Sequence, residues 1–421
     1  MSTPPKAKAP LKPLDEALQA LLETAHAVDA VETVDLLHAH GRVLAQDVLA
    51  ELAVPGFDNS AMDGYALALD DLAMSEDGSL PVSQRVPAGS APEPLQRGTC
   101  VRIFTGAPLP AGADTVVMQE DCVVREERVY IEGEPKRGQM VRRRGEDIEL
   151  GEVVLRTGVH LTSADLGLAA SLGRASLPVR RRLRVALFST GDELKMPGEV
   201  APADMPPGAI YNSNRYFLNS LLTQLGCEVT DLGVIPDQLA ATQAALREAA
   251  QTHDVLLTSG GVSVGEEDHV KPAVQSLGAL DLWAIAIKPG KPFAHGHVRR
   301  ADGSCAHFIG LPGNPVSSYV TFAVLVRPFL RKLQGSAQWQ VTPMALQANF
   351  EWPKPDKRRE FLRVRRNAAG GLDLYPNQGS GVLTSLSWAD GLVDNPPGRA
   401  VANGDMVKFI SMAQLFGTES H

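Results

Sequence analysis

The amino-acid sequence predicts an α/β multidomain protein built around a doubly wound parallel sheet. From residue 181 to 335, short apolar β-rich runs alternate with helical patterns, as expected for parallel βαβ units. Residues 53–144 carry short strand-like runs broken by Gly and Pro, and short strands return after Gly335. We therefore expect a central doubly wound domain, a helical domain, an inserted β-rich module and a C-terminal β-barrel-like domain.

Size and composition limit the classes of function. The 421 residues are 44% hydrophobic and 21% charged, which allows large cores and two to four domains. The formal net charge of −9, from 40 basic and 49 acidic residues, creates no global field that would attract nucleic acid or an anionic membrane. The four cysteines are scattered and form no Cys-x-x-Cys pair, which fits a reducing cytoplasm. No membrane span or signal peptide is expected.

The N-terminal part is expected to hold a helical domain that the β-rich module interrupts. Residues 1–13 are rich in Pro, Ala and Lys and are interpreted as a disordered tail. Apolar positions recur at helical spacing over residues 14–28, and residues 153–172 are partly helical in pattern. We therefore assign 14–52 plus 145–180 to a helical domain, which the family resemblance given below implies is the dimerisation domain, and 53–144 to the inserted module. Strand-like runs in the module are Cys100–Phe104, Thr115–Gln119 and Arg128–Ile131.

The central domain, residues 181–335, is defined by apolar strands and by helix signals. One helix is expected to begin near Ser213 and Asn214 and to stop at Gly226, and another to begin with Asn314 as N-cap and Pro315. The strands are predicted at Leu183–Phe188, Glu228–Val234, Val255–Thr258, Leu282–Ile287 and His307–Ile309. Residues 340–415 form the C-terminal β domain, with strands predicted at Phe361–Val364, Val382–Leu386 and Met406–Ile410.

The loops that follow the predicted strands are the expected place for chemistry, because ligands bind a doubly wound sheet beyond the carboxyl ends of its strands. Gly260 and Gly261 let backbone N–H groups approach an anion, while Lys288 and Lys291 supply point charges. Such glycines can also simply build turns, but five loops of this kind at one edge favour a cradle for an oxyanion. The candidate substrate-binding residues in these loops are Thr190, Gly191, Ser259, Gly260, Gly261, Ser263, Lys288, Lys291, Pro312, Gly313, Asn314 and Pro315.

Carboxylates from three of these loops suggest a metal site. Glu193, Asp237 and Asp268 have no His or Cys partner set, which suits an oxygen-ligated cation such as Mg²⁺ rather than zinc. Each acid taken alone is more typical of a solvated loop or a helix cap, so their shared placement carries the prediction. Neither a GxxxxGK[ST] loop nor a GxGxxG fingerprint occurs, which disfavours an ordinary ATPase or an NAD-dependent dehydrogenase.

The inserted module contributes two turn-rich polar stretches, residues 55–66 and 105–114. Asn, Asp, Gly and Pro serve structural turns and functional loops equally, so physical reasoning leaves both interpretations open. Residues 142–147, Arg-Arg-Arg-Gly-Glu-Asp, favour a surface charge cluster over an anion or metal contact on composition alone.

Together these motifs resemble the molybdopterin molybdenumtransferase (MoeA) family, whose relatives include plant molybdenum insertase E-domains and the C-terminal domain of gephyrin. The resemblance covers nearly the whole chain after the tail. It rests on eight strings in family order: PGFDNSAMDGYA, RIFTGAPLPAGADTVVMQED, RRRGEDI, ALFSTGDEL, IYNSNR, LLTSGGVSVGEEDHVKP, IKPGKPFAHG and GLPGNPVSS. No single string would be specific, but eight together are.

The resemblance implies an elongated four-domain homodimer with a cleft between the doubly wound, molybdopterin-binding domain of one subunit and the β module of the other. Residues of both would serve catalysis, and further residues would bind anions. The implied catalytic residues are Asp63, Thr105, Asp147, Glu193, Asp237 and Asp268, and the last three would hold metal. The implied molybdate or phosphate contacts are Lys288, Lys291 and Ser317, with Arg358, Arg363 and Ser380 as looser matches.

The implied reaction takes adenylyl-molybdopterin and molybdate as substrates, uses Mg²⁺, releases AMP and leaves molybdenum on the dithiolene sulfurs. The enzyme would act in the cytoplasm beside the molybdopterin-adenylylating enzyme and downstream molybdenum-cofactor proteins. Two departures concern the metal site, because Gln238 stands where many members have a second acid and His269 where tyrosine is common. The alternatives are a molybdopterin adenylyltransferase, a non-catalytic gephyrin-like scaffold, and a related nucleotide pyrophosphatase.

Overall fold

A computed structural model describes residues 11–261 and 269–417 and divides them into two compact units. Unit 1 contains the chain up to Gln46, residues 157–163, and everything from Ser176 onward. Unit 2 contains residues 47–156 and 164–175. None of the helices in the described ranges is both long and apolar enough to cross a membrane.

Unit 1 is centred on a six-stranded mixed sheet. Four neighbouring strands are parallel, and two antiparallel strands complete one side. In spatial order the strands are β16 (Glu228–Ile235), β13 (Arg184–Thr190), β17 (Val255–Ser259), β21 (Cys305–Leu311), β20 (Pro292–Arg299) and β18 (Gly278–Ala284). The parallel part confirms the predicted doubly wound sheet, and its strands end together at one edge.

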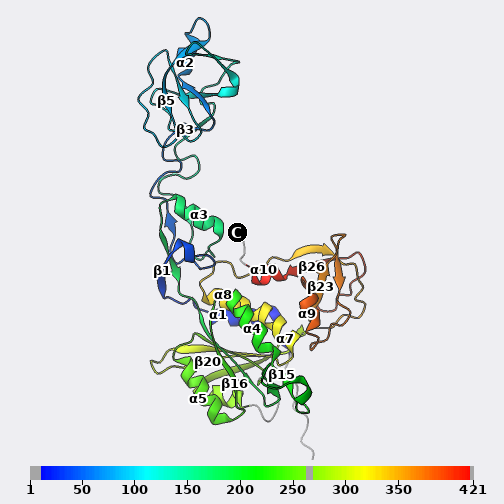
Figure 1. The fold of residues 1–421 in the computed structure, drawn as a ribbon. Helices are drawn as coiled ribbons and strands as arrows, with labels where there is room; N and C mark the ends of the chain where they lie inside the picture. The colour runs from blue at the N-terminus through cyan, green and yellow to red at the C-terminus, as the bar shows by residue number, and fades with distance from the viewer. Residues whose placement is uncertain (1–10, 262–268, 418–421) are drawn as a thin grey trace, which may run out of the picture. The chain divides into compact units, whose positions relative to one another are not determined.

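Alternate residues of the parallel strands build a separate apolar core on each face of the sheet, because successive side chains of a strand point to opposite faces. Leu187, Leu257 and Ile309 join one core, and Phe188 and Phe308 join the other. The first core is covered by α1 (Leu14–Glu23), α4 (Ser213–Gln224), α7 (Pro315–Thr321) and α8 (Arg327–Leu333), and the second by α5 (Leu239–Ala250) and α6 (Val270–Leu277). Figure 1 shows α4 and α5 on opposite sides of this sheet.

The helix signals of the central domain are confirmed. Helix α4 begins after Asn212, whose side chain accepts a hydrogen bond from the Arg215 N–H, and the chain reverses at Gly226 with a φ of +80°. Helix α7 begins at Pro315 after Asn314. A π-helical segment (Phe322–Val326) joins α7 to α8, just before Pro328.

The C-terminal part of unit 1 is a second six-stranded sheet. It consists of β19 (Ile287–Lys288), β23 (Arg359–Arg366), β25 (Gly391–Asn395), β26 (Met406–Ser411) and β22 (Met344–Gln347) in spatial order, with β24 (Leu372–Leu374) also on β23. Two predicted strands are confirmed here, but the strand predicted at Val382–Leu386 is wrong. That segment holds the short helix α9 (Thr384–Trp388), in which the Ser385 hydroxyl donates to the Val382 carbonyl.

Unit 2 contains another six-stranded sheet, and the three strand-like runs predicted in the module are confirmed within it. Its order is β7 (Thr115–Met118), β4 (Gly64–Leu67), β6 (Cys100–Ile103), β5 (Ser79–Val86), β9 (Arg128–Ile131) and β8 (Cys122–Arg125). The unit also holds α2 (Leu69–Ala73) and the two-stranded pairs β3 (Asn59–Ser60) with β10 (Val141–Arg142) and β2 (Val48–Leu49) with β11 (Val153–Leu155).

The segment that we expected to be a helical domain contains more short strands than helices. Besides α1 and α3 (Ser163–Ser171), it holds β2, β11 and the antiparallel pair β1 (Val31–Asp35) with β12 (Ser176–Arg180). Residues 11–13, which we placed in the tail, are ordered, because Lys12 forms a β-bridge with Ile285 and its ammonium lies 4.0 Å from the Trp283 ring centroid. Short β14 (Leu194–Lys195), β15 (Ile210–Tyr211) and α10 (Met412–Phe416) complete unit 1.

Candidate functional site

The candidate site is a cavity of about 730 Å³ in unit 1, at the carboxyl edge of the central sheet. The loops after β13, β17 and β21 form one part of its wall, and the C-terminal sheet forms another. Its lining includes the predicted residues Thr190, Glu193, Ser259, Gly260, Lys288, Lys291, Pro312, Gly313, Asn314, Pro315 and Ser317, together with Arg358 and Ser380. Strand-end loops therefore meet here as the sequence predicts.

Buried polar groups form the sheet side of the cavity. Thr190 and Ser259 are the last residues of β13 and β17 and are 6% and 3% exposed. Gly260 follows with a φ of +92°, and its N–H donates to the Leu311 carbonyl at 3.0 Å, which joins two of the cavity loops. Gly191 and Gly261 continue the loops just outside the cavity lining. Hydroxyls and loop backbone at the ends of apolar strands suit a polar ligand.

Two asparagines that the sequence marked only as helix-cap or motif residues also shape the wall. Asn212 is 2% exposed and donates to the Ser189 hydroxyl at 3.0 Å. Asn214, in the first turn of α4, donates to the Gly313 carbonyl at 2.7 Å. The Asn214 bond fixes the loop before α7 to the start of α4, and the Asn212 bond fixes the start of α4 to the end of β13. The IYNSNR string was the sequence signal for these residues, and it does not reveal which loops their side chains contact.

The lysine-bearing segment connects two strands of the central sheet, β18 and β20, and pairs with the C-terminal sheet. Ile287 and Lys288 form β19, which pairs in parallel with β23 of the C-terminal sheet, so that Lys288 lies opposite Glu360. At Gly290 the φ is +105°, and a Cβ there would lie 2.4 Å from the Thr321 hydroxyl. Glycine is therefore required for this loop to pack on α7. From the sequence we placed Lys288 at the edge of the central sheet, and we did not predict the pairing of β19 with β23.

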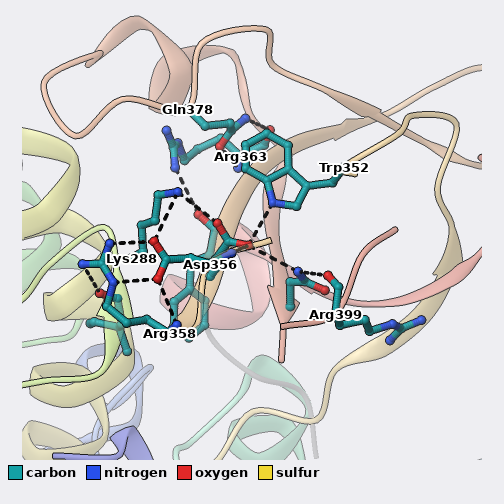
Figure 2. A network of polar contacts seen from close by, with 11 residues as sticks. Lys288, Trp352, Asp356, Arg358, Arg363, Gln378 and Arg399 are labelled. Carbon is teal, nitrogen blue, oxygen red and sulfur yellow. Dashed lines mark hydrogen bonds and ion pairs between the residues drawn. The ribbon is translucent and has the colours of Figure 1, made fainter. Parts of the chain in front are cut away.

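Carboxylates of the C-terminal sheet hold two of the cavity's cations (Figure 2). The Lys288 ammonium lies 3.2 Å from Glu360 Oε1 and 3.6 Å from Asp356 Oδ2. Arg358 donates to Asp356 through Nη2 at 2.8 Å and through Nε at 3.0 Å. These charge-assisted bonds from Arg358 hold the pKa of the Asp356 carboxyl well below its usual range. Asp356 therefore remains an anionic counter-charge beside the cavity.

Arg363, a looser match in the family resemblance, is buried behind the cavity wall. It is 1% exposed and donates to Ser385 Oγ at 3.2 Å and to the carbonyls of Phe361 at 3.1 Å and Gly379 at 3.3 Å. Burial lowers the pKa of its guanidinium to about 10. Ser380 is at the cavity, and its carbonyl accepts from the Val316 N–H at 3.0 Å. Arg363 thus supports the Gly379–Ser380 wall from behind.

The three predicted metal ligands are not brought together within the described residues. Glu193 is exposed and lines the cavity, whereas Asp237 lies between β16 and α5, away from the lining. Asp268 and Ser263 lie outside the described residues. In residues 11–261 and 269–417, no group of three or more His, Cys, Asp or Glu side chains is arranged to hold a metal ion.

In unit 2, two of the three predicted catalytic residues contact each other. Asp63 accepts hydrogen bonds from the Thr105 N–H at 2.8 Å and from its hydroxyl at 2.7 Å; Thr105 is exposed and Asp63 is partly exposed. The bond from the Thr105 N–H, with that from the hydroxyl, lowers the pKa of Asp63. Asp147 is exposed in the turn after β10, where its N–H donates to the Val54 carbonyl.

The neighbouring basic cluster is internally paired. Asp58 accepts from Arg143 Nη1 at 2.7 Å and from the Arg144 N–H at 2.8 Å, and the latter bond is the main reason that its pKa is lowered. Glu146 accepts from the Arg143 N–H. These contacts fit the surface charge cluster that composition favoured.

Comparison with known proteins agrees with this order of parts along the chain. Residues 12–173 match the MoeA N-terminal region (domain I and II), residues 186–332 the probable molybdopterin binding domain, and residues 345–412 the MoeA C-terminal region (domain IV). The molybdopterin molybdenumtransferase of Haemophilus influenzae is 44% identical over 332 residues, which are 78% of this chain and 80% of that protein. The chain belongs to the molybdopterin molybdenumtransferase family.

Further members agree along most of the chain. The molybdopterin molybdenumtransferase of a Nostoc species is 37% identical over 380 residues, covering 87% of this chain and 85% of that protein. The crystal structure of a molybdopterin biosynthesis MoeA protein from Pyrococcus horikoshii has a TM-score of 0.82 and 28% identity, and covers 95% of this chain and 99% of that one. Molybdopterin molybdenumtransferases therefore resemble this chain outside the doubly wound domain as well as within it.

Proposed function

We propose that this chain inserts molybdenum into molybdopterin. The substrates are adenylyl-molybdopterin and molybdate: the pyrophosphate bond is hydrolysed, AMP leaves, and molybdenum is bound by the dithiolene sulfurs. The observation that carries the proposal is the cavity at the edge of the central sheet, where Lys288, Lys291 and Arg358 meet the loops after β17 and β21. Family membership supports the same reaction.

The cavity chemistry suits oxyanions. Lysine supplies compact point charges, and arginine a planar fork that matches oxyanion geometry, so three such side chains favour molybdate and phosphate groups. Hydroxyls of Ser259, Thr190 and Ser317, all at most 6% exposed, offer neutral donors from fixed positions. Preorganised donors of this kind stabilise charge that develops on a phosphate during bond cleavage.

We propose that Glu193 is a ligand of Mg²⁺ at the cavity. Mg²⁺ is usually held by one or two carboxylates plus substrate phosphates and water, so a three-carboxylate cage is not required. Glu193 supplies one carboxylate at the cavity, and Asp268 is the second candidate. Asp237 is less suited, because it lies away from the cavity lining. The cation would neutralise charge on the phosphates.

The proposal extends to the oligomeric state and the cellular location of the enzyme. We propose a homodimer in which Asp63, Thr105 and Asp147 of one subunit serve the cavity of the other, and a cytoplasmic enzyme that receives its substrate from the adenylylating enzyme. The Asp63–Thr105 contact supports this, because it fixes an ionised carboxylate at the surface of unit 2.

The test is AMP release and cofactor formation by the purified chain with adenylyl-molybdopterin, Mg²⁺ and molybdate. We expect Lys288→Ala to lower molybdate-dependent turnover by about 100-fold, the effect of removing one strong charge-stabilising donor. Lys408→Ala is the matched control, because Lys408 is exposed on β26 of the same C-terminal sheet and does not line the cavity.

The outcomes separate the alternatives. AMP release that does not depend on molybdate would indicate a pyrophosphatase and contradict the proposal. No AMP release under any condition would favour a scaffold, and formation of adenylyl-molybdopterin from ATP and molybdopterin would favour an adenylyltransferase.

A further inference from the structure

Glu360 on β23 divides its two carboxylate oxygens between two sets of partners. Three of these partners, Lys288, Trp352 and Asp356, are labelled in Figure 2. Oε1 lies 3.2 Å from the Lys288 ammonium at the cavity. Oε2 accepts from Trp352 Nε1 at 2.8 Å, from the Asp356 N–H at 3.1 Å and from Asn395 Nδ2 at 3.5 Å. One oxygen therefore faces the candidate site, while the other is anchored in the C-terminal sheet.

Burial makes this arrangement rigid. Glu360 is 1% exposed, and a buried carboxylate is tolerated only when it is paired and hydrogen-bonded. Lys288 is 38% exposed at its side chain and lies directly opposite Glu360 in the parallel pairing of β19 with β23. The backbone register and the ion pair thus specify the same position for the ammonium.

We propose that Glu360 is a positioning residue that fixes the Lys288 ammonium for oxyanion binding. The inference rests on the proposed function, in which Lys288 contacts an oxyanion. Lysine is among the side chains that lose the most rotamer freedom when they are held in one position. Glu360 imposes that order before the ligand arrives, and the C-terminal sheet thereby sets the geometry of a loop of the central domain.

A second buried ion pair on the same strand provides a comparison. Asp394 of β25 is 4% exposed and receives Arg359 Nε and Nη2, each at 2.6 Å. Neither residue lines the cavity. If buried pairs in this sheet serve only its stability, the two pairs should respond alike to substitution. If Glu360 positions Lys288, only its pair should affect the ligand.

The substitution Glu360→Gln changes the contact of Oε1 and preserves those of Oε2. The glutamine carbonyl can occupy the Oε2 position and keep accepting from Trp352 and the Asp356 N–H, whereas its amide NH₂ would face the Lys288 ammonium as a second donor. Trp352→Phe is the reciprocal change, because it removes one donor to Oε2 and leaves Oε1 beside Lys288. Asp394→Asn is the matched control, an isosteric loss of charge at the other pair.

The first measurement is molybdate binding to the full chain by calorimetry, together with KM for molybdate and kcat. We expect Glu360→Gln to weaken molybdate binding and raise its KM by about 10-fold, with a smaller change in kcat. Lys288 then keeps only the longer 3.6 Å contact with Asp356, so the ligand must supply more of the order of its side chain. Asp394→Asn should leave both within about twofold even if it lowers the melting temperature. Trp352→Phe should shift stability more than molybdate affinity.

A second measurement reports on the amine itself. Limited acetylation followed by peptide mass spectrometry gives the labelling rate of Lys288 relative to Lys291 in the same molecule. We expect Glu360→Gln to raise this ratio several-fold, because the Lys288 ammonium loses its shorter ion pair and keeps only the 3.6 Å contact with Asp356. Asp394→Asn should leave the ratio unchanged.

Unchanged or tighter molybdate binding in Glu360→Gln would overturn the inference, because Glu360 would then only neutralise Lys288 or stabilise the sheet. An equal effect of Asp394→Asn on binding would overturn it as well. Wild-type binding in Lys288→Ala would instead contradict the proposed oxyanion site, so failure of the inference and failure of the proposed function are distinguishable.

Discussion

The two large sheets of unit 1 both have apolar cores but differ in the charged side chains that their strands bury. The central sheet has apolar strands, and β17, Val-Leu-Leu-Thr-Ser, is buried throughout without a charge. Strand β23 of the C-terminal sheet places Glu360 and Arg363 in its interior, each 1% exposed. Both sheets border the same cavity.

This difference shows two ways of building one site. The central sheet leaves its chemistry to the loops beyond its strand ends, so its strands are free to maximise apolar burial. The C-terminal sheet reaches the cavity through Lys288 of β19, and the buried Glu360 of β23 holds that side chain from behind the cavity lining. Substitutions in the two interiors should therefore have different costs.

The largest effect is expected in the apolar interior of the central sheet. Phe308 on β21 is fully buried, and Phe308→Ala removes its packing and leaves a cavity, so the free energy of unfolding should fall by about 3–5 kcal/mol. Chemical denaturation of the full chain measures it. A loss below about 1 kcal/mol would show that this core can collapse around the gap.

Breaking a charged pair in the C-terminal sheet should rank second. Asp394→Asn removes the buried carboxylate of Arg359 but keeps an amide acceptor, and Arg359 Nη1 still donates to the exposed Asp15 carboxylate at 2.9 Å. We therefore expect a loss of about 2–3 kcal/mol, less than complete removal of a partner. The same denaturation experiment applies, with Asp405→Asn in the turn before β26 as control. An unchanged free energy of unfolding would mean that Asp15 and solvent suffice to compensate the Arg359 charge.

Two histidines of the central sheet should make its contribution to stability depend on pH. Burial, with help from neighbouring His307 and His297, lowers the pKa of His295 to about 3, and burial, then His26 and His297, lowers that of His307 to about 4. Both values lie below the ordinary pKa of about 6.5, so the folded state binds fewer protons than the unfolded one. The stability that these groups contribute is fully present above a pH of about 6.5 and falls as the pH drops toward about 4.

The variant His295→Gln removes one of these titrations and should flatten the acid limb of the stability curve. Denaturation midpoints between about pH 7 and about pH 4 test this, and His38→Gln is a control because His38 is exposed in the short 3₁₀ turn after β1. Parallel curves for wild type and His295→Gln would contradict the expected proton linkage.

The smallest effect is expected where a charge is buried without a carboxylate. Arg363 makes its hydrogen bonds to a hydroxyl and two carbonyls, and burial already disfavours its charged form, as its lowered pKa shows. Arg363→Met fills similar space without that desolvation cost, so stability should change by less than about 1 kcal/mol in either direction. A loss above about 3 kcal/mol would assign Arg363 a larger structural role.

Much of the fold could be predicted because its signals are local. Apolar runs in the sequence predicted β13, β16, β17 and β21, and capping residues predicted the starts of α4 and α7. Strand β20, Pro-Phe-Ala-His-Gly-His-Val-Arg, was not predicted, because its proline, glycine and histidines give no strand pattern, and it is stabilised by pairing with β18 and β21. The strand predicted at Val382–Leu386 failed because hydrogen bonds of Ser385 to Val382 favour a helical turn.

The candidate site divides in the same way. Loop residues such as Ser259, Gly260 and Lys288 could be named from their position after predicted strands, and the cavity contains them. The sequence could not identify Asn212, Asn214 or the carboxylates of Asp356 and Glu360 as site residues. Each of them contacts a residue that is distant in the sequence. Asp237 followed the same strand-end rule but lies away from the lining, since the rule gives the edge of the sheet and not the direction of a loop.

The sequence by itself determined the doubly wound sheet, the loops that carry its chemistry and the family resemblance, because periodicity, glycine positions and strand-end spacing are local properties of a chain. Only the tertiary structure decided that Lys288 is also part of the C-terminal sheet and that Glu360 holds it across 72 residues of sequence. The physical reason is that strand pairing and buried ion pairs depend on which segments meet in space, and no local pattern records that choice.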